Sequence, residues 1–307
     1  MKTTDLTTDI GRLHLANPVC VASGTFGFAE EYAELIDVDL LGAVVTKGIS
    51  IEVRRGNPAP RTAEVPAGLL NSVGLENPGV QDFIGEKLPR LSEFRPAVIA
   101  NIIGNTIDDY ARLSGMLNGL KGLDGLEVNI SCPNVSQGGI AFGTDPEIAA
   151  RVARAVVEET SLPVLVKLSP NVTDIVAVAK RVADVGVDGL TLINTLRAMA
   201  IDHETGVPLL GNVIGGLSGP AIRPVAVRVV FEVTRAVDIP VVGCGGIMNW
   251  RDAVEFIRAG ASAVQVGSAS FRNPSTCIEV LRGLEKFLVD NEYSSVRELV
   301  GTVQLPE

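Results

Sequence analysis

Eight short apolar runs, each followed by a stretch of helical periodicity, constrain the fold of this 307-residue chain more than any other feature. Parallel strands that are buried on both faces appear as runs rich in Val and Ile, and a helix-sized connection joins each to the next. Eight such units over about 250 residues predict a closed (β/α)8 TIM barrel, and an open doubly wound sheet is the alternative. The predicted strands span residues 19–23, 43–47, 97–102, 125–132, 163–168, 189–194, 240–243 and 263–267.

The stretches between these runs carry the start and stop signals of helices. Residues 146–159 follow Thr144-Asp145 and begin with a proline, which is favoured in the first turn of a helix. Residues 173–185 have apolar side chains at helical spacing and end before Gly186, and glycine often terminates a helix. Residues 221–236 and 250–258 are predicted helices on the same grounds.

Two segments depart from this alternation. Residues 7–18, TTDIGRLHLANP, predict a short N-terminal hairpin that plugs the bottom of the barrel. Residues 48–78 are rich in proline and show no clear period, so we expect an extended loop at the active site. No second domain is indicated, and residues 1–307 are predicted to form a single domain.

Composition and charge exclude several classes of protein. The net charge is −10 and no basic run is longer than Arg54-Arg55, so nucleic acid is not an expected partner. Neither a signal peptide nor an apolar run of about 18 residues is present, so we expect no membrane span and a cytoplasmic location. Four widely spaced cysteines without a CxxC pair argue against zinc and against a disulfide framework.

The residues that end the strands are the candidates for chemistry, because barrels of this kind build their active sites there. Polar, basic or glycine residues close every predicted strand: Ser23-Gly24, Lys47-Gly48, Asn101, Asn129 to Cys132, Lys167, Asn194-Thr195, Gly243 to Gly246, and Gly267-Ser268. The last two ends, GCGGI and QVGSAS, either bind a phosphate through bare backbone N–H groups or simply make tight turns. A phosphate site without P-loop or Rossmann spacing indicates a phosphorylated cofactor such as FMN.

Two lysines and one cysteine are the candidate reagents. Lys47 and Lys167 could each form a Schiff base, act as a fixed positive charge, or extend the ammonium into water. Cys132 follows polar residues and precedes a loop, where a thiol near a lysine can act as a base or nucleophile. The other three cysteines, Cys20, Cys244 and Cys277, are interpreted as buried packing residues. The only histidines, His14 and His203, do not end strands, so histidine acid–base chemistry is not expected.

Nine motifs, in order along the chain, resemble those of the dihydroorotate dehydrogenases: ASGTFGF, TKGIS, NSVGLENPG, NISCPN, VKLSPN, INT, GGLSGPAI, GCGGI and QVGSAS. The resemblance covers residues 6 to 290 and is closest to the cytosolic NAD-linked branch of the family. The quinone-linked branch has an N-terminal extension and a serine base, and this chain has neither. The fumarate-linked cytosolic branch also uses cysteine and is the alternative.

The resemblance implies that the chain oxidises dihydroorotate to orotate in de novo pyrimidine (UMP) biosynthesis. Cys132 would remove the C5 proton as hydride passes from C6 to FMN, with Lys47 beside it, beneath a lid formed by residues 133–143 and the proline-rich segment. The implied FMN contacts are Ser23, Lys47, Gly48, Asn101, Asn129, Lys167, Ile193, Gly219, Gly245, Gly246, Gly267 and Ser268. The implied substrate contacts are Lys47, Asn71, Ser72, Val73, Gly74, Leu75, Asn129, Asn194 and Thr195.

The NAD-linked branch also implies a partner. Electrons would pass to NAD through a second subunit with FAD and a 2Fe–2S cluster, because this chain has no cysteine cluster and no FAD fingerprint. The implied assembly is a homodimer within a heterotetramer, and no metal site is expected on this chain. Three other functions stay open: a Schiff-base barrel lyase that uses Lys167, a flavoenzyme for another pyrimidine ring, and a non-enzymatic flavin- or phosphate-binding module.

Overall fold

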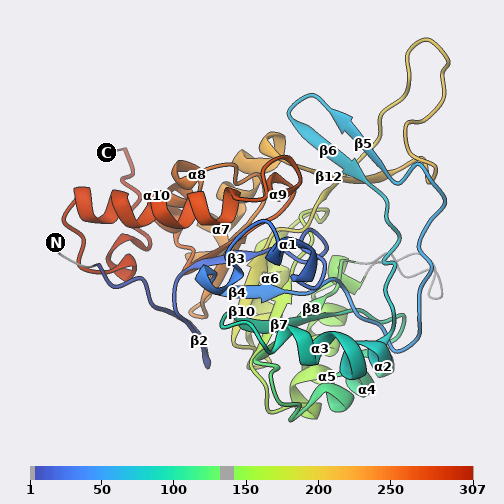
Figure 1. Cartoon of the computed structure of the whole chain (residues 1–307), viewed down its shortest axis with the longest axis horizontal. Coiled ribbons are helices and arrows are strands. Elements are labelled where there is room, and N and C mark those ends of the chain that lie inside the picture. Colours follow the sequence, from blue (N-terminus) through green and yellow to red (C-terminus); the bar gives the residue numbers. More distant parts are fainter. Residues whose placement is uncertain (1–3, 132–141, 307) are drawn as a thin grey trace.

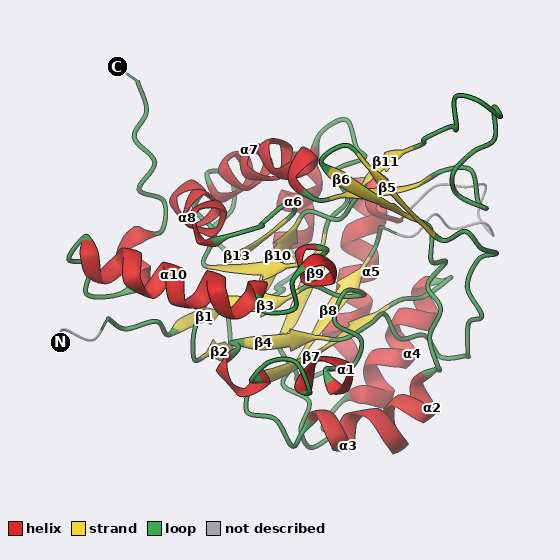
Figure 2. Cartoon of the chain, turned by 45° about the horizontal axis from the view of Figure 1, so that its top comes forward, coloured by secondary structure: helices red, strands yellow, loops and turns green. Residues whose placement is uncertain are grey.

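The computed structural model describes residues 4–131 and 142–306, in which eight parallel strands close into a barrel (Figures 1 and 2). The strands follow chain order around the barrel, and the last pairs with the first. The predicted (β/α)8 barrel is therefore confirmed, and the doubly wound alternative is wrong. The barrel strands are β3 (Val19–Val21), β4 (Ala43–Val45), β7 (Ala97–Ile102), β8 (Gly125–Asn129), β9 (Val164–Lys167), β10 (Gly189–Leu192), β13 (Val241–Cys244) and β14 (Ala263–Val266).

Helices surround the barrel, and the four predicted ones are present as α5 to α8. The main helices are α4 (Ile107–Leu117), α5 (Pro146–Glu159), α6 (Ile175–Ala183), α7 (Arg223–Thr234), α8 (Trp250–Ala259) and α10 (Thr276–Asp290). The shorter pieces are α1 (Glu30–Ala33), η1 (Val38–Leu40), α2 (Val80–Asp82), η2 (Phe83–Lys87), α3 (Leu88–Leu91), η3 (Phe142–Thr144), η4 (Pro220–Ile222), α9 (Ala269–Arg272) and η5 (Val296–Leu299). Helix α5 begins after Asp145, whose carboxylate accepts hydrogen bonds from the backbone N–H groups of Glu147 and Ile148. Pro146 lies in the first turn, where its missing N–H costs nothing. None of the helices in these two described ranges is long and apolar enough to span a membrane.

The two faces of the barrel strands differ because successive side chains point to opposite sides. Outward-facing residues such as Val21, Val44 and Val128 pack beneath the helices in the large core. A second apolar cluster fills the lower part of the barrel interior: Cys20, Ala43, Val45, Ile99, Leu165, Val242 and Ala263, joined by Ile10, Leu13 and Leu15 from the N-terminal segment.

The N-terminal segment forms the predicted hairpin, β1 (Thr8–Ile10) and β2 (Leu13–Leu15). Its turn needs glycine at Gly11, where φ is +59° and a Cβ would come within 2.6 Å of Asp188. Arg12 then donates to the Asp188 carboxylate at 2.8 and 2.9 Å and to the carbonyl oxygen of Ser161 at 2.8 Å. The hairpin is thereby fixed against the amino ends of the barrel strands, as the plug that the sequence predicts.

The proline-rich segment contains regular structure that the sequence analysis does not predict. Strands β5 (Thr62–Val65) and β6 (Gly68–Asn71) form a hairpin that joins β11 (Leu196–Ala198) and β12 (Gly215–Ser218) in a four-stranded antiparallel sheet. The strands are short and mostly half-exposed, so they lack the apolar contrast that marks a strand in sequence. This sheet lies at the end of the barrel opposite the β1–β2 hairpin (Figure 2).

Candidate active site

A cleft opens at the carboxyl ends of the barrel strands, the place where barrels of this kind bind small molecules. Ten residues predicted from the sequence line it: Ser23, Lys167, Ile193, Asn194, Thr195, Gly219, Gly245, Gly246, Gly267 and Ser268. Another cleft, between residues 50–54 and the start of α4, is lined by none of the predicted residues. Of these two clefts, the one at the strand ends therefore contains the residues that the sequence predicts for a site.

The glycines of this cleft have two different physical explanations. At Gly246 φ is +77° and a Cβ would come within 2.7 Å of the Gly219 carbonyl oxygen, so the tight turn itself requires glycine. At Gly267 φ is not positive, and a Cβ would meet only Ala22 and Thr25 at ordinary contact distances of 3.5 and 3.8 Å. The chain itself therefore does not require glycine at Gly267, and such a glycine is typical of places where a ligand comes close to the backbone.

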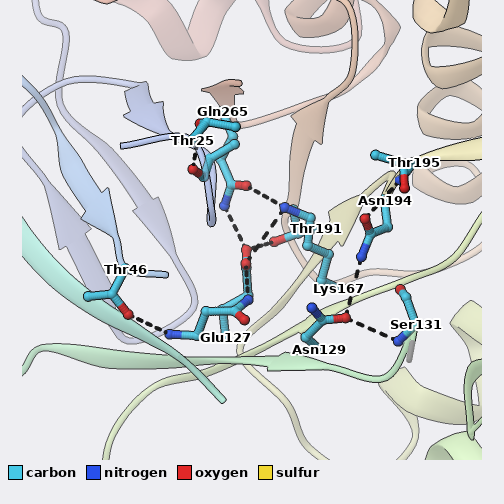
Figure 3. A network of polar contacts seen from close by, with 12 residues as sticks. Thr25, Thr46, Glu127, Asn129, Ser131, Lys167, Thr191, Asn194, Thr195 and Gln265 are labelled. Atoms are coloured by element: carbon cyan, nitrogen blue, oxygen red, sulfur yellow. Dashed lines mark hydrogen bonds and ion pairs between the residues drawn. The ribbon is translucent and has the colours of Figure 1, made fainter. Parts of the chain in front are cut away.

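A buried polar network lies inside the barrel directly below the cleft (Figure 3). The carboxylate of Glu127, on β8, is fully buried and accepts hydrogen bonds from Asn101 Nδ2 at 2.8 Å, Thr191 Oγ1 at 2.9 Å and Gln265 Nε2 at 2.7 Å. The sequence analysis misses Glu127, Thr191 and Gln265. A signal for them exists, because an acidic or amide residue within a strand buried on both faces needs a partner inside the protein.

Lys167 connects this network to the cleft. Its Nζ donates to Gln265 Oε1 at 3.2 Å and lies 3.8 Å from Glu127 Oε1, and its side chain is almost completely buried. Burial is the largest influence and acts to lower the pKa of Lys167, but the negative charge of Glu127, the interaction with Cys244 and the hydrogen bond to Glu127 together outweigh it, and the pKa of Lys167 is raised. A lysine that attacks a carbonyl must be neutral, so this environment favours a fixed positive charge over a Schiff base.

The side-chain amide of Asn101 has a hydrogen-bond partner for its NH2 group but none for its oxygen among the described residues. Its Nδ2 is committed to Glu127, whereas its Oδ1 is buried and has no hydrogen-bond partner in the described part of the chain. A Cβ placed on Gly48 would lie 3.2 Å from this oxygen, so Gly48 leaves room beside it. An unpaired buried acceptor costs about 1–3 kcal/mol, and a ligand N–H at this position would remove that cost.

Two predicted substrate residues meet at the ends of β8 and β10. Asn129 Oδ1 accepts a hydrogen bond from Asn194 Nδ2 at 3.3 Å and from the Ser131 backbone N–H at 3.1 Å (Figure 3). Tyr110 donates its hydroxyl to the Asn129 carbonyl oxygen at 2.7 Å and so holds the end of β8. The assigned strand ends at Asn129, three residues before its predicted end at position 132. Cys132 and residues 133–141 lie outside the described residues.

Apart from Lys47, the remaining predicted substrate residues lie at the end of strand β6 of the antiparallel sheet and in the segment that follows it. Asn71 Nδ2 donates to the Gly216 carbonyl oxygen at 3.3 Å, and a Cβ on Gly216 would collide with Thr195 of the cleft. The following residues, Ser72, Val73, Gly74 and Leu75, form an irregular segment. Asn57 donates to the Ser72 carbonyl oxygen at 3.0 Å, while Ser72 Oγ is buried without a partner among the described residues. Lys47 follows β4, is half-buried, and does not line the cleft.

The three described cysteines are free, buried thiols. Burial raises the pKa of Cys20 to about 12 and that of Cys277 to about 11, so both stay protonated as packing residues should. Cys244 was not expected in the site, yet it lines the cleft beside Lys167. Burial raises its pKa as well, so it contributes a neutral thiol. Within residues 4–131 and 142–306, no three His, Cys, Asp or Glu side chains converge to hold a metal ion.

The fold and this cleft define an enzyme of the (β/α)8-barrel class that holds a polar small molecule at the carboxyl ends of its strands. The family model for dihydroorotate dehydrogenase matches residues 5–288. The chain belongs to the dihydroorotate dehydrogenase family, which confirms the resemblance carried by the nine motifs.

Two relatives narrow the comparison. The chain is 56% identical over 292 residues to a Desulforudis audaxviator protein, with 95% of each chain covered. It is 52% identical over 305 residues to a Citrifermentans bemidjiense protein, covering 99% of this chain and 100% of the relative. Both relatives are named dihydroorotate dehydrogenase B (NAD(+)), catalytic subunit. The similarity is thus to the NAD-linked type and not to the fumarate-linked alternative.

Proposed function

We propose that this chain is the catalytic subunit of an NAD-linked dihydroorotate dehydrogenase, which oxidises dihydroorotate to orotate in pyrimidine biosynthesis. The observation that carries the proposal is the cleft at the strand ends, where ten residues expected from the family meet in a chain of that family. The negative charge of Glu127 beside Lys167 favours a charged ammonium there and so argues against the Schiff-base lyase.

The residues of the cleft fit FMN as the cofactor. Gly245, Gly246, Gly267 and Ser268 would hold its phosphate through backbone N–H groups, and Gly219 would be a further contact. Lys167 offers donors and the unpaired Asn101 Oδ1 an acceptor, and a flavin ring edge carries both carbonyl oxygens and an N–H. When bound, FMN supplies the acceptor for the substrate hydride.

The substrate would lie between the Asn129–Asn194 pair and the segment that begins at Asn71. Asparagine amides match the amide and carbonyl edges of a dihydropyrimidine ring, and Lys47 would pair with the ring carboxylate. Cys132 would act as the general base that takes the C5 proton. Its place in the chain supports this role, since it directly follows Ser131 at the mouth of the barrel.

The electrons would leave through a second polypeptide. The relatives are named as catalytic subunits, which supports a partner. We propose that this partner carries FAD and a 2Fe–2S cluster and reduces NAD, and that two catalytic chains form the core of a cytoplasmic heterotetramer.

An absorbance spectrum of the purified chain, before and after anaerobic dihydroorotate, tests the proposal. We expect flavin bands that bleach with dihydroorotate and stay unchanged with dihydrouracil. Adding the partner subunit and NAD should restore the bands, and fumarate should not. A colourless chain that cannot be reconstituted with FMN would refute the cofactor, and bleaching by dihydrouracil alone would refute the substrate.

A further inference from the structure

We propose that Glu127 is a positioning residue that sets the polarity of the cleft floor. From inside the barrel, it keeps Lys167 as a charged donor and turns Asn101 Oδ1 into an acceptor toward the bound ring. The inference rests on the proposed function in one respect only, because the ring is that of the cofactor. The network itself is a property of the folded chain.

The first step is the position of the carboxylate. Glu127 is fully buried, and its partners come from four other strands: Asn101 on β7, Lys167 on β9, Thr191 on β10 and Gln265 on β14. An ionised carboxylate can only accept hydrogen bonds, so each partner must present an N–H or O–H to it. One side chain therefore dictates the orientation of groups on half of the barrel.

The second step concerns the two amides. Asn101 must turn its NH2 toward Glu127, so its oxygen points away and is left without a partner in the residues described. Gln265 must do the same, and its oxygen then accepts from Lys167 Nζ at 3.2 Å. If position 127 were neutral and could donate, either amide could reverse, and the cleft floor would lose its fixed pattern.

The third step concerns charge. The Lys167 ammonium is buried, and a buried charge is costly unless an opposite charge compensates it. Among the described residues, the one carboxylate within 4.0 Å of its Nζ is that of Glu127, at 3.8 Å. An ammonium has three donors, and the hydrogen bond to Gln265 uses one. Glu127 therefore keeps Lys167 charged while leaving donors for the cleft.

The chemical consequence follows from where this charge lies. A flavin gains electron density on its ring edge when it is reduced, and a fixed ammonium beside the cleft stabilises that form more than the oxidised one. Replacing Glu127 with a neutral residue should favour neutral Lys167. The bound flavin should then become harder to reduce.

The variant Glu127→Gln tests this with almost no change in shape. We expect the preference for reduced over oxidised FMN to fall at least tenfold, a midpoint potential lower by about 30 mV for the two-electron couple. Thr191→Val is the matched control, because it removes one neutral hydrogen bond from the same carboxylate. Its midpoint potential should correspond to a preference within twofold of the wild type.

The exchange variant, Glu127→Gln with Gln265→Glu, keeps one carboxylate and one amide but places the carboxylate on the other partner of Lys167. We expect its midpoint potential to lie closer to the wild type than that of Glu127→Gln, because a negative charge beside Lys167 is restored while Asn101 is no longer fixed. Two results would overturn the inference: a folded Glu127→Gln variant with the wild-type potential, or a folded exchange variant displaced as far as Glu127→Gln.

A measurement without flavin separates this inference from the proposed function. In cofactor-free protein, Glu127→Gln and Lys167→Met should each raise the unfolding equilibrium constant more than the double variant does, because each alone leaves a buried charge unpaired. Additive effects would contradict the pairing, whether or not the chain binds FMN. A wild-type chain that binds no flavin would refute the proposed function and leave this cycle intact.

Discussion

The lower and upper halves of the barrel interior use the same strands but opposite chemistry. On β7, Ile99 lies below Asn101, and on β9, Leu165 lies below Lys167. Two residues along a strand correspond to about 6.6 Å, so a single repeat of the pleat separates an apolar layer from a polar one. The lower half packs against the N-terminal hairpin, whereas the upper half carries charge and an unpaired acceptor. Stability and chemistry are thus divided by depth within one barrel.

The largest effect should come from the base in the upper half. Cys132→Ser should slow bleaching of the flavin by anaerobic dihydroorotate by roughly 10²–10⁴-fold, the usual contribution of a positioned base. The free energy of unfolding should stay unchanged. Stopped-flow absorbance measures the rate, and Cys277→Ser, a thiol change away from the cleft, is the control that should bleach normally. Equal rates in both variants would remove Cys132 from the mechanism.

The lower half should show the reverse result. Leu165→Ala leaves a cavity in the apolar cluster and should lower the free energy of unfolding by about 2–5 kcal/mol. The folded variant should keep its flavin spectrum and bleaching rate. Urea denaturation gives the free energy, and Leu35→Ala, at a side chain that is 60% exposed, should stay within about 0.5 kcal/mol of the wild type. Loss of flavin from folded Leu165→Ala protein would break the division by depth.

A smaller effect should show whether the space beside Gly267, in the cleft at the strand ends, is needed by the ligand or by the chain itself. Gly267→Ala meets no close atom of the chain, so the free energy of unfolding without cofactor should change by less than about 1 kcal/mol. The added methyl group should nevertheless weaken FMN binding about tenfold, because it fills space that the ligand needs. Fluorescence titration with FMN measures this, and Gly85→Ala, where a Cβ would meet nothing within 4 Å, is the unaffected control. Unchanged affinity in Gly267→Ala would show that the phosphate lies elsewhere.

The smallest effect should appear at the plug as a dependence on pH. Burial acts to raise the pKa of Asp188, but the hydrogen bonds from Arg12 and from backbone N–H groups outweigh it, and the pKa of Asp188 is lowered below 3.8. A carboxylate whose pKa is lowered by folding stabilises the folded state at pH values above its pKa in the unfolded chain. This stabilisation is lost as the pH falls through its pKa in the folded protein. Asp188→Asn should cost about 1 kcal/mol at pH 7 and less below pH 4. Denaturation at both pH values checks this; an equal loss at both would exclude the charge.

Much of the barrel could be predicted from the sequence because its strands are buried on both faces. The runs around Val44, Val98 and Val264 are apolar without interruption, and that pattern alone places the strands. The strand ends could be predicted as well, since polar residues and glycines mark the one edge of the sheet that faces a ligand. Eight of those residues line one cleft: Ser23, Lys167, Asn194, Thr195, Gly245, Gly246, Gly267 and Ser268.

Which residues pair within the polar network could not be predicted from local sequence. Glu127 lies 26 residues from Asn101, 64 from Thr191 and 138 from Gln265, and only the closed barrel brings them together. The alternation around Glu127 indicates a strand that is exposed on one face, whereas the closed barrel buries both faces. The hairpin of β5 and β6 could not be predicted for a different reason. It is stabilised by the pairing of β6 with β12, which lies far along the chain.

Because β14 pairs with β3, the cleft is complete only when the first and the last barrel strands are both in place. Ala22, Ser23 and Thr25 follow the first barrel strand, and Gly267, Ser268 and Ala269 follow the last. Because the two strands are parallel neighbours, these residues line the same cleft side by side. During synthesis, the edge of β3 that pairs with β14 stays unpaired until almost the entire chain has been made. An unpaired strand edge is prone to wrong pairing. A ligand that needs both strand ends can bind only the finished barrel. Its binding would then withdraw completed chains from the pool that can still misassemble.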